Sequence, residues 1–252
     1  MRRRLLLLAV CALALTGCAA GPGTADAAQG ARLTVFAAAS LQGAFEEIAD
    51  RFEDEHPGVA VQAIRYDGSS TLATQLREGA TADVFASADE PNMAKVADAG
   101  LAASPTVFAT NTLTLVVPAG NPAGVAGLSD LARADRVIVQ CAREVPCGAA
   151  ADRLLAAAGV TPSVDSYEQN VTAVLTKVAA GEADAGLVYV TDAAGRADLE
   201  TVATPGADAV VNRYPIAALA DAPEPEAAAA FVAFVRGPVG QRVLADHGFG
   251  AP

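Results

Sequence analysis

Short apolar segments alternate with alanine-rich helical segments along this chain, and this pattern constrains the fold more than any other feature. The apolar segments read as strands at residues 33–37, 59–64, 83–87, 112–117, 136–140, 186–190 and 214–219. The first helix between them carries one buried face, because its apolar residues are spaced by four, three and four: Leu41, Phe45, Ile48 and Phe52. The alternation predicts an α/β fold with largely parallel sheets.

Two segments, 111–118 and 212–219, look like passages between two halves of the molecule. They predict a discontinuous first lobe made of residues 31–110 plus 212–252 and a second lobe made of residues 111–211. A cleft between lobes joined by two strands is a natural ligand site, because hinge bending can close it over a ligand. A single doubly wound sheet is the alternative that the pattern leaves open.

The first 17 residues have the form of an export signal rather than part of the fold. Three arginines, residues 2–4, precede an apolar run from 5 to 15 that is too short for a permanent membrane span. The run ends in LTGC at 15–18, which resembles the lipobox of bacterial lipoproteins and implies lipidation of Cys18. An ordinary secretory signal cleaved after Ala20 or Ala28 is the alternative. Residues 18–30 contain no large apolar side chain and read as a flexible tether.

The charge balance excludes nucleic acid as a partner. Without residues 1–17 the chain keeps 14 basic and all 29 acidic residues, a formal charge of −15. Phosphate backbones are bound by clustered Lys and Arg, whereas those here are scattered. The acidity is better explained by solubility.

Two serines each follow a short strand and open a predicted helix: Ser40 in the first helix and Ser69 in the second. A helix start presents unpaired backbone N–H groups and a partial positive charge, and a serine hydroxyl adds a neutral donor. An oxyanion can therefore be held there without Lys or Arg. The alternative is that each serine serves only as an N-cap.

Features of the second half predict the same kind of site. The turn VPCG at 145–148 precedes an alanine-rich helix, and Asn170 precedes the buried face of the next one, which begins at Val171. Tyr189 ends an apolar strand, where a phenol can donate a hydrogen bond. A tyrosine at such a place is also commonly a core or rim residue.

Five blocks in order resemble the periplasmic molybdate-binding proteins of ABC importers: AAASL at 37–41, GSSTLATQL at 68–76, GATADVFASAD at 79–89, VPCG at 145–148 and GEADAGLVYVTD at 181–192. The resemblance implies a type II periplasmic-binding-protein-like α/β fold, with two mixed or parallel sheets flanked by helices and joined by two crossover strands.

The resemblance also implies a function and its partners. The protein would capture molybdate or tungstate and deliver it to an ABC transporter permease, with no other cofactor and as a monomer. Matched motif by motif, the ion would be held by the side chains and N–H groups of Ser40 and Ser69, the N–H groups of Cys147 and Val171, and the hydroxyl of Tyr189.

Cys147 stands where this family often has alanine, and Cys141 lies six residues earlier. In an exported protein two such cysteines are expected to form a disulfide. The expected ligand contact is a backbone N–H, so cysteine removes no donor. A zinc or copper site lacks further ligands, because the histidines, His56 and His247, lie in other segments.

Enzymatic interpretations find little support in the sequence. It contains no Gly-x-Ser-x-Gly elbow, Walker loop or zinc-protease helix. Three acidic residues, Asp83, Asp89 and Asp192, could suggest a metal site but are expected to cap helices or satisfy loops. A closer rival is a binding protein for another small oxyanion such as sulfate or phosphate, or for an organic ligand in the same cleft.

Overall fold

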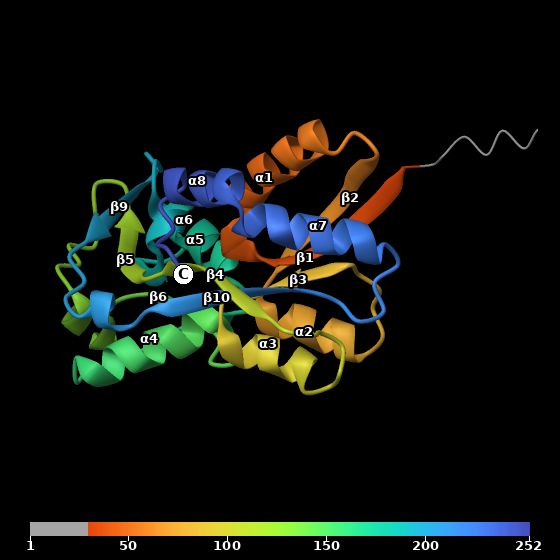
Figure 1. Cartoon of the computed structure of the whole chain (residues 1–252). Helices are drawn as coiled ribbons and strands as arrows, with labels where there is room; N and C mark the ends of the chain where they lie inside the picture. The colour runs from red at the N-terminus through yellow and green to blue at the C-terminus, as the bar shows by residue number, and fades with distance from the viewer. Residues whose placement is uncertain (1–29) are drawn as a thin grey trace, which may run out of the picture.

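The computed structural model describes residues 30–252 as two lobes, each built on a five-stranded sheet with helices packed against it (Figure 1). The predicted export signal, Cys18 and nearly all of the predicted tether lie outside the described residues. Within residues 30–252, no helix has the length and apolarity needed to cross a membrane.

The first sheet has the strand order β2-β1-β3-β10-β4. Its strands are β1 (Ala31–Ala38), β2 (Val59–Asp67), β3 (Val84–Ala86), β4 (Thr106–Asn111) and β10 (Asn212–Ala218). Around it lie α1 (Gln42–Glu55), α2 (Ser69–Arg77), α3 (Glu90–Ala97), α7 (Pro225–Arg236) and α8 (Pro238–Asp246). Helices α1, α7 and α8 lie on one side of this sheet and α2 and α3 on the other (Figure 1).

The second sheet has the order β7-β6-β8-β5-β9. Its strands are β5 (Leu113–Pro118), β6 (Ile138–Cys141), β7 (Ser166–Glu168), β8 (Ala185–Tyr189) and β9 (Leu199–Val202). Its helices are α4 (Pro146–Ala157), α5 (Val171–Ala179) and the short α6 (Val190–Ala193). Three short 3₁₀ turns complete the described chain: Ala39–Leu41, Leu128–Ala132 and Ala207–Ala209.

Both sheets are mixed. β1 pairs in parallel with β2 and β3, and β6 pairs in parallel with β7 and β8, as the alternating pattern predicts. β10 and β5 instead run antiparallel to both of their neighbours. The prediction of a two-lobed α/β fold is confirmed, and the alternative of one doubly wound sheet is wrong.

The chain crosses between the sheets at two adjacent places. β4 ends at Asn111 and β5 begins at Leu113, so Thr112 alone separates a strand of one sheet from a strand of the other. β10 begins at Asn212, directly opposite Asn111 in the antiparallel ladder. Two asparagines, buried at 4% and 2% exposure, therefore mark the junction of the lobes.

The predicted apolar face of the first helix is part of the larger core. Leu41, Phe45, Ile48 and Phe52 have no exposed surface. The Phe52 ring meets the Phe231 ring edge-on at 5.2 Å between centroids, which ties α1 to α7. The buried face was thus determined by the 3.6-residue repeat, while its partner helix comes from the far end of the chain.

Three strands were not expected from the sequence: β4, β7 and β9. β7 is only Ser-Tyr-Glu, without an apolar run, and β9 buries little beyond Leu199. β4 merges in sequence with β5, because the two are separated by one residue although they belong to different sheets. Short half-exposed strands are stabilised by their neighbours rather than by their own pattern.

Candidate functional site

All five residues predicted to hold a ligand line one cavity between the lobes. Ser40 and Ser69 come from the first lobe, and Cys147, Val171 and Tyr189 from the second. The remaining lining residues are small or apolar except for one asparagine: Ala39, Gly68, Ala88, Val145, Pro146 and Asn170. The cavity is small: its empty space, part of which is open to solvent, is about 190 Å³.

Three helix starts converge on this cavity. α2 is preceded by Gly68, α4 by Val145 and α5 by Asn170, and all three residues line the cavity. Asn170 is the predicted N-cap: its Oδ1 accepts from the Ala173 N–H at 2.9 Å. Cys147 and Val171 lie in the first turns of their helices, where backbone N–H groups find no partner within the helix.

The two serines are not N-caps, which corrects the alternative interpretation. Gly68, not Ser69, precedes α2, and Ser40 lies inside the 3₁₀ turn before α1; neither helix start has a side-chain cap bond. The buried Ser69 Oγ instead accepts from the Ala88 N–H at 2.9 Å, which leaves its own proton free to donate. Ser40 Oγ lies 3.0 Å from Tyr214 Oη.

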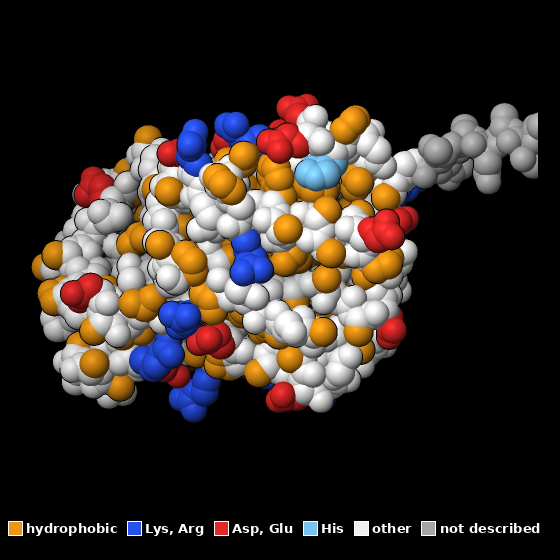
Figure 2. Space-filling view, in the orientation of Figure 1, with side chains coloured by type: hydrophobic (Ala, Val, Ile, Leu, Met, Phe, Trp, Pro, Cys, Tyr) orange, Lys and Arg blue, Asp and Glu red, His pale blue; other side chains and the backbone are white. Residues whose placement is uncertain are grey.

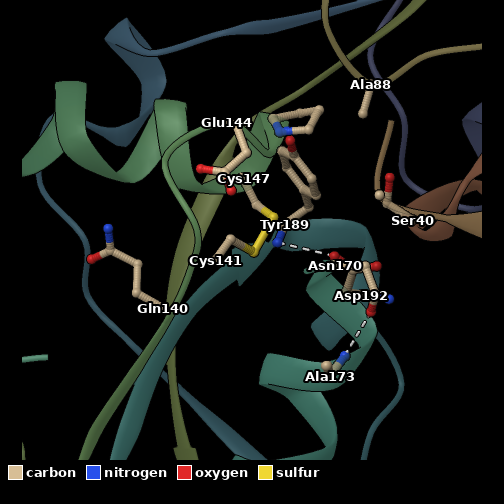
Figure 3. The surroundings of a disulfide bond; sticks show 12 residues. Ser40, Ala88, Gln140, Cys141, Glu144, Cys147, Asn170, Ala173, Tyr189 and Asp192 are labelled. Carbon is tan, nitrogen blue, oxygen red and sulfur yellow. Dashed lines mark hydrogen bonds between the residues drawn. A yellow bond between two sulfur atoms is a disulfide. The ribbon is translucent and has the colours of Figure 1, made fainter. Parts of the chain in front are cut away.

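Tyr189 is both a core residue and a cavity residue. Only 1% of it is exposed, and its Oη accepts from Asn212 Nδ2 at 2.7 Å. Burial raises the pKa of this phenol well above its ordinary value, so it stays neutral and protonated. Figure 3 shows its ring beside the disulfide, with Ser40 and Ala88 of the other lobe across from it.

Sequence reasoning missed the polar residues behind the cavity: Asn111, Asn212 and Tyr214. Tyr214 is fully buried, packs edge-on against the Tyr189 ring at 5.9 Å and reaches Ser40. Desolvation raises the pKa of its phenol, so it too remains protonated. The only sequence signal was that Asn212 and Tyr214 occur in a crossover strand.

The cavity carries no formal charge. None of its lining residues is Asp, Glu, Lys, Arg or His. Within residues 30–252, no three His, Cys, Asp or Glu side chains gather as a metal site would require. An anion placed in this cavity would therefore meet neutral groups alone among its lining residues.

The acidic residues considered as metal ligands instead satisfy backbone groups, as expected. Asp89 caps α3 by accepting from the Asn92 N–H at 3.0 Å. Asp192 accepts from the Tyr189 N–H at 3.1 Å, and Asp83 accepts from the N–H groups of Thr34 and Glu224.

The predicted disulfide is present. Cys141 ends β6 and Cys147 lies in the first turn of α4, and their sulfur atoms are bonded. The turn between them is tight, because a Cβ on Gly148 would lie 2.0 Å from the Ala142 carbonyl oxygen. The bridge thus fastens the start of α4, and the Cys147 N–H with it, to the end of β6.

The lobes are in contact at the rim of the cavity. Asn170 Nδ2 donates to Asp67 Oδ1 at 3.0 Å from one lobe to the other. Nearby, Gly68 lies so close to Gln169 that a Cβ would be 2.1 Å from the Gln169 carbonyl oxygen. Glycine at this position therefore allows the two lobes to meet.

Comparison with known proteins agrees with this architecture. The family model described as bacterial extracellular solute-binding protein matches residues 33–250. The chain is 50% identical over 227 residues to the molybdate-binding protein ModA of Mycobacterium tuberculosis H37Rv, covering 89% of this chain and 87% of that protein. The chain therefore belongs to the bacterial extracellular solute-binding protein family.

Two solved structures show how widely the fold is used. The periplasmic molybdate-binding protein of Azotobacter vinelandii superposes with a TM-score of 0.72 at 21% identity, over 87% of this chain and 99% of that one. The sulfate-binding protein SubI of Mycobacterium tuberculosis H37Rv superposes with a TM-score of 0.73 at 21% identity, over 87% of this chain and 86% of that one. The same fold thus occurs in proteins named for two different anions.

Removing the disulfide should lower stability without removing a cavity donor. The chain-entropy model gives about 2 kcal/mol for so short a loop, so the variant Cys141→Ala/Cys147→Ala should unfold at correspondingly lower urea concentration. The wild-type protein kept reduced by dithiothreitol serves as the control and should match the variant. Equal stability of oxidised wild type and variant would contradict this prediction.

Asp192 should make stability depend on pH in an unusual direction. Burial raises the pKa of its carboxyl group from 3.8 to about 7. The folded state holds this proton where the unfolded chain has released it, so the contribution of Asp192 to stability is highest at low pH. The contribution falls as pH rises from about 4 to about 7, by at most about 1.4 kcal/mol per pH unit, and is fully lost above that range.

Asp192→Asn isolates this effect, because asparagine can still accept from the Tyr189 N–H but does not titrate. Urea unfolding of both proteins between pH 5 and 8 gives two stability profiles. The difference between the two profiles should show the contribution of Asp192 falling as pH rises, since both proteins share all other titrating groups. Parallel profiles would show that Asp192 ionises normally.

Proposed function

We propose that the protein captures molybdate, and the similarly sized tungstate, in the cavity between its lobes. The observation that carries this proposal is the set of neutral donors brought there from both lobes: the hydroxyls of Ser40, Ser69 and Tyr189 and the N–H groups of Cys147 and Val171. The 50% identity to a protein named as molybdate-binding supports the same ligand.

The surroundings of the hydroxyls favour donation into the cavity. Ser69 Oγ already accepts from Ala88, and Tyr189 Oη already accepts from Asn212. Each hydroxyl has one proton, which is then available for a ligand. Hydrogen bonds to a dianion are strong because the acceptor is ionised, and this compensates for removing the ion from water.

A cavity that offers only donors discriminates among oxyanions. Phosphate at neutral pH carries a proton that needs an acceptor, and here its hydroxyl would stay unpaired. Sulfate has the charge of molybdate but is smaller, so donors set at the larger radius would hold it with stretched bonds. Tungstate should compete well with molybdate.

Delivery to an ABC importer permease is the role that we infer for the loaded protein. We propose that residues 1–17 direct export, that Cys18 is lipidated, and that residues 18–30 tether a monomer to the outer face of the membrane. We further propose that residues 31–110 plus 212–252 and residues 111–211 move as two lobes about the crossovers near 111 and 212.

A second oxyanion is the strongest alternative, since a sulfate-binding protein shares the fold. An organic ligand is disfavoured by the small cavity. A hydrolase is disfavoured because no histidine lines this cavity; the His247 side chain lies in a neighbouring pocket that Ser40 also lines. In the described residues His247 pairs with Glu47, and His56 stacks on Phe52.

Calorimetric titration of residues 31–252 with molybdate, tungstate, sulfate and phosphate tests the proposal. We expect submicromolar binding of molybdate and tungstate, one ion per chain, and sulfate binding weaker by about a hundredfold or more, which corresponds to about 2.7 kcal/mol. Tighter binding of sulfate or phosphate would show that one of these ions, and not molybdate, is the ligand. No binding of any oxyanion would refute the proposed function.

Ser69→Ala should weaken molybdate binding by about 10- to 150-fold, because it removes one donor to a charged acceptor. The adjacent Ser70→Ala is the matched control. Ser70 Oγ is buried, does not line the cavity, and has no hydrogen-bond partner within residues 30–252. We expect unchanged affinity for this control, and an equal loss in both variants would contradict the assignment of Ser69.

A further inference from the structure

The side chain of Asn212 connects the cavity to a cation at the surface. Asn212 Nδ2 donates to Tyr189 Oη at 2.7 Å and to the Ala88 carbonyl oxygen at 3.1 Å, and lies 3.5 Å from the Pro146 carbonyl oxygen. Asn212 Oδ1 accepts from Arg153 Nη2 at 3.1 Å. The amide is almost completely buried, whereas Arg153 lies on the exposed side of α4.

Two neighbours fix which way this amide points. A guanidinium group can only donate, so the oxygen of Asn212 must face Arg153. A carbonyl oxygen can only accept, so the nitrogen must face Ala88. Both requirements select the same orientation, and that orientation places an N–H against Tyr189.

The orientation of the amide decides what Tyr189 offers to the cavity. When Asn212 donates to Tyr189 Oη, the phenol accepts there and its single proton can turn to a ligand. With the amide reversed, Tyr189 would donate to Asn212 and present lone pairs to the ligand. An anion would then face a repelling oxygen in place of a donor.

We propose that Arg153 and Asn212 are positioning residues that keep Tyr189 a donor to the bound oxyanion. The hydrogen-bond chain from Arg153 through Asn212 to Tyr189 also brings positive charge to an otherwise neutral cavity without placing a cation in it. This inference rests on the proposed function. It explains how a protein with a net negative charge holds a dianion with neutral groups.

The surface around α4 fits this role. Figure 2 shows several Lys and Arg side chains, with Asp or Glu side chains between them, over the part of α4 nearer α3, although the chain as a whole is acidic. Arg213, next to Asn212 in β10, pairs with Glu90 at 3.6 Å and is half-exposed. Successive residues of a strand point to opposite faces of the sheet, so the Arg213 side chain points away from the Asn212 side chain. Arg213 has the same charge as Arg153 but does not contact the Asn212 amide.

The test measures molybdate affinity in charge-matched variants. Arg153→Met should weaken binding about 3- to 10-fold, and Arg153→Lys, which can still donate to Asn212 Oδ1, should restore it. Asn212→Asp should weaken it at least a hundredfold, because a carboxylate only accepts hydrogen bonds, so the Tyr189 hydroxyl would donate to it instead of to the ligand. Arg213→Met is the control for net charge and should change affinity less than twofold.

A second background separates the hydrogen-bond chain from a direct charge effect. In Tyr189→Phe the phenol is absent, so adding Arg153→Met should cause no further loss. A full loss in that background, an equal loss in Arg213→Met, or an unchanged affinity in Arg153→Met would each overturn the proposal. Thermal melts of the ligand-free variants verify that all remain folded.

A readout without ligand distinguishes failure of this inference from failure of the proposed function. The Asn212 side-chain amide protons of wild type should exchange slowly with solvent in nitrogen-15 NMR spectra, and Arg153→Met should speed their exchange. If wild type binds no oxyanion, the proposed function fails. The exchange measurement then still tests whether the hydrogen-bond chain from Arg153 through Asn212 to Tyr189 exists. Unaltered Asn212 signals in Arg153→Met would then overturn it.

Discussion

The pairing of β10 with β4 is the constraint on which the rest of the structure depends. Asn212 lies opposite Asn111, and each adjoins the point where the chain leaves one sheet for the other. Because β10 returns into the middle of the first sheet, its first residues lie between the lobes. Asn212 thereby reaches Tyr189 of one sheet and Ala88 beside the other. The same antiparallel pairing that closes the fold thus places Asn111, Asn212 and Tyr214 behind the cavity.

The cavity is buried, and this explains why it is lined by neutral groups and not by a cation. A buried cation would attract an oxyanion strongly, but it would also cost several kcal/mol to desolvate when the site is empty. Helix starts and hydroxyls provide fixed partial charges without that cost. Behind them, Ala88, Asn212 and Tyr214 contact the three hydroxyls, so the donors are oriented before a ligand arrives.

Local pattern predicted the elements that carry their own signal. The spacing of Leu41, Phe45, Ile48 and Phe52 predicted the buried face of α1, and the family motifs predicted the five residues that meet in the cavity. β7 and β9 were not predicted, because a strand of three or four residues with at most one buried residue shows no distinct period. The positions of the two serines were predicted, and the alternative that they only cap the helices is wrong, since Gly68 and the 3₁₀ turn occupy the places next to the helices.

The sequence by itself determined the fold class, the division into two halves, the disulfide partners and the motif residues, because each produces a recognisable pattern within a short stretch of sequence. Only the tertiary structure decided which groups stand behind those residues. Arg153, Asn212 and Tyr189 are separated by up to 59 residues, and no local pattern links them. Their contacts depend on how two sheets are joined at the crossover strands, which fixes distances that neither periodicity nor motif can encode.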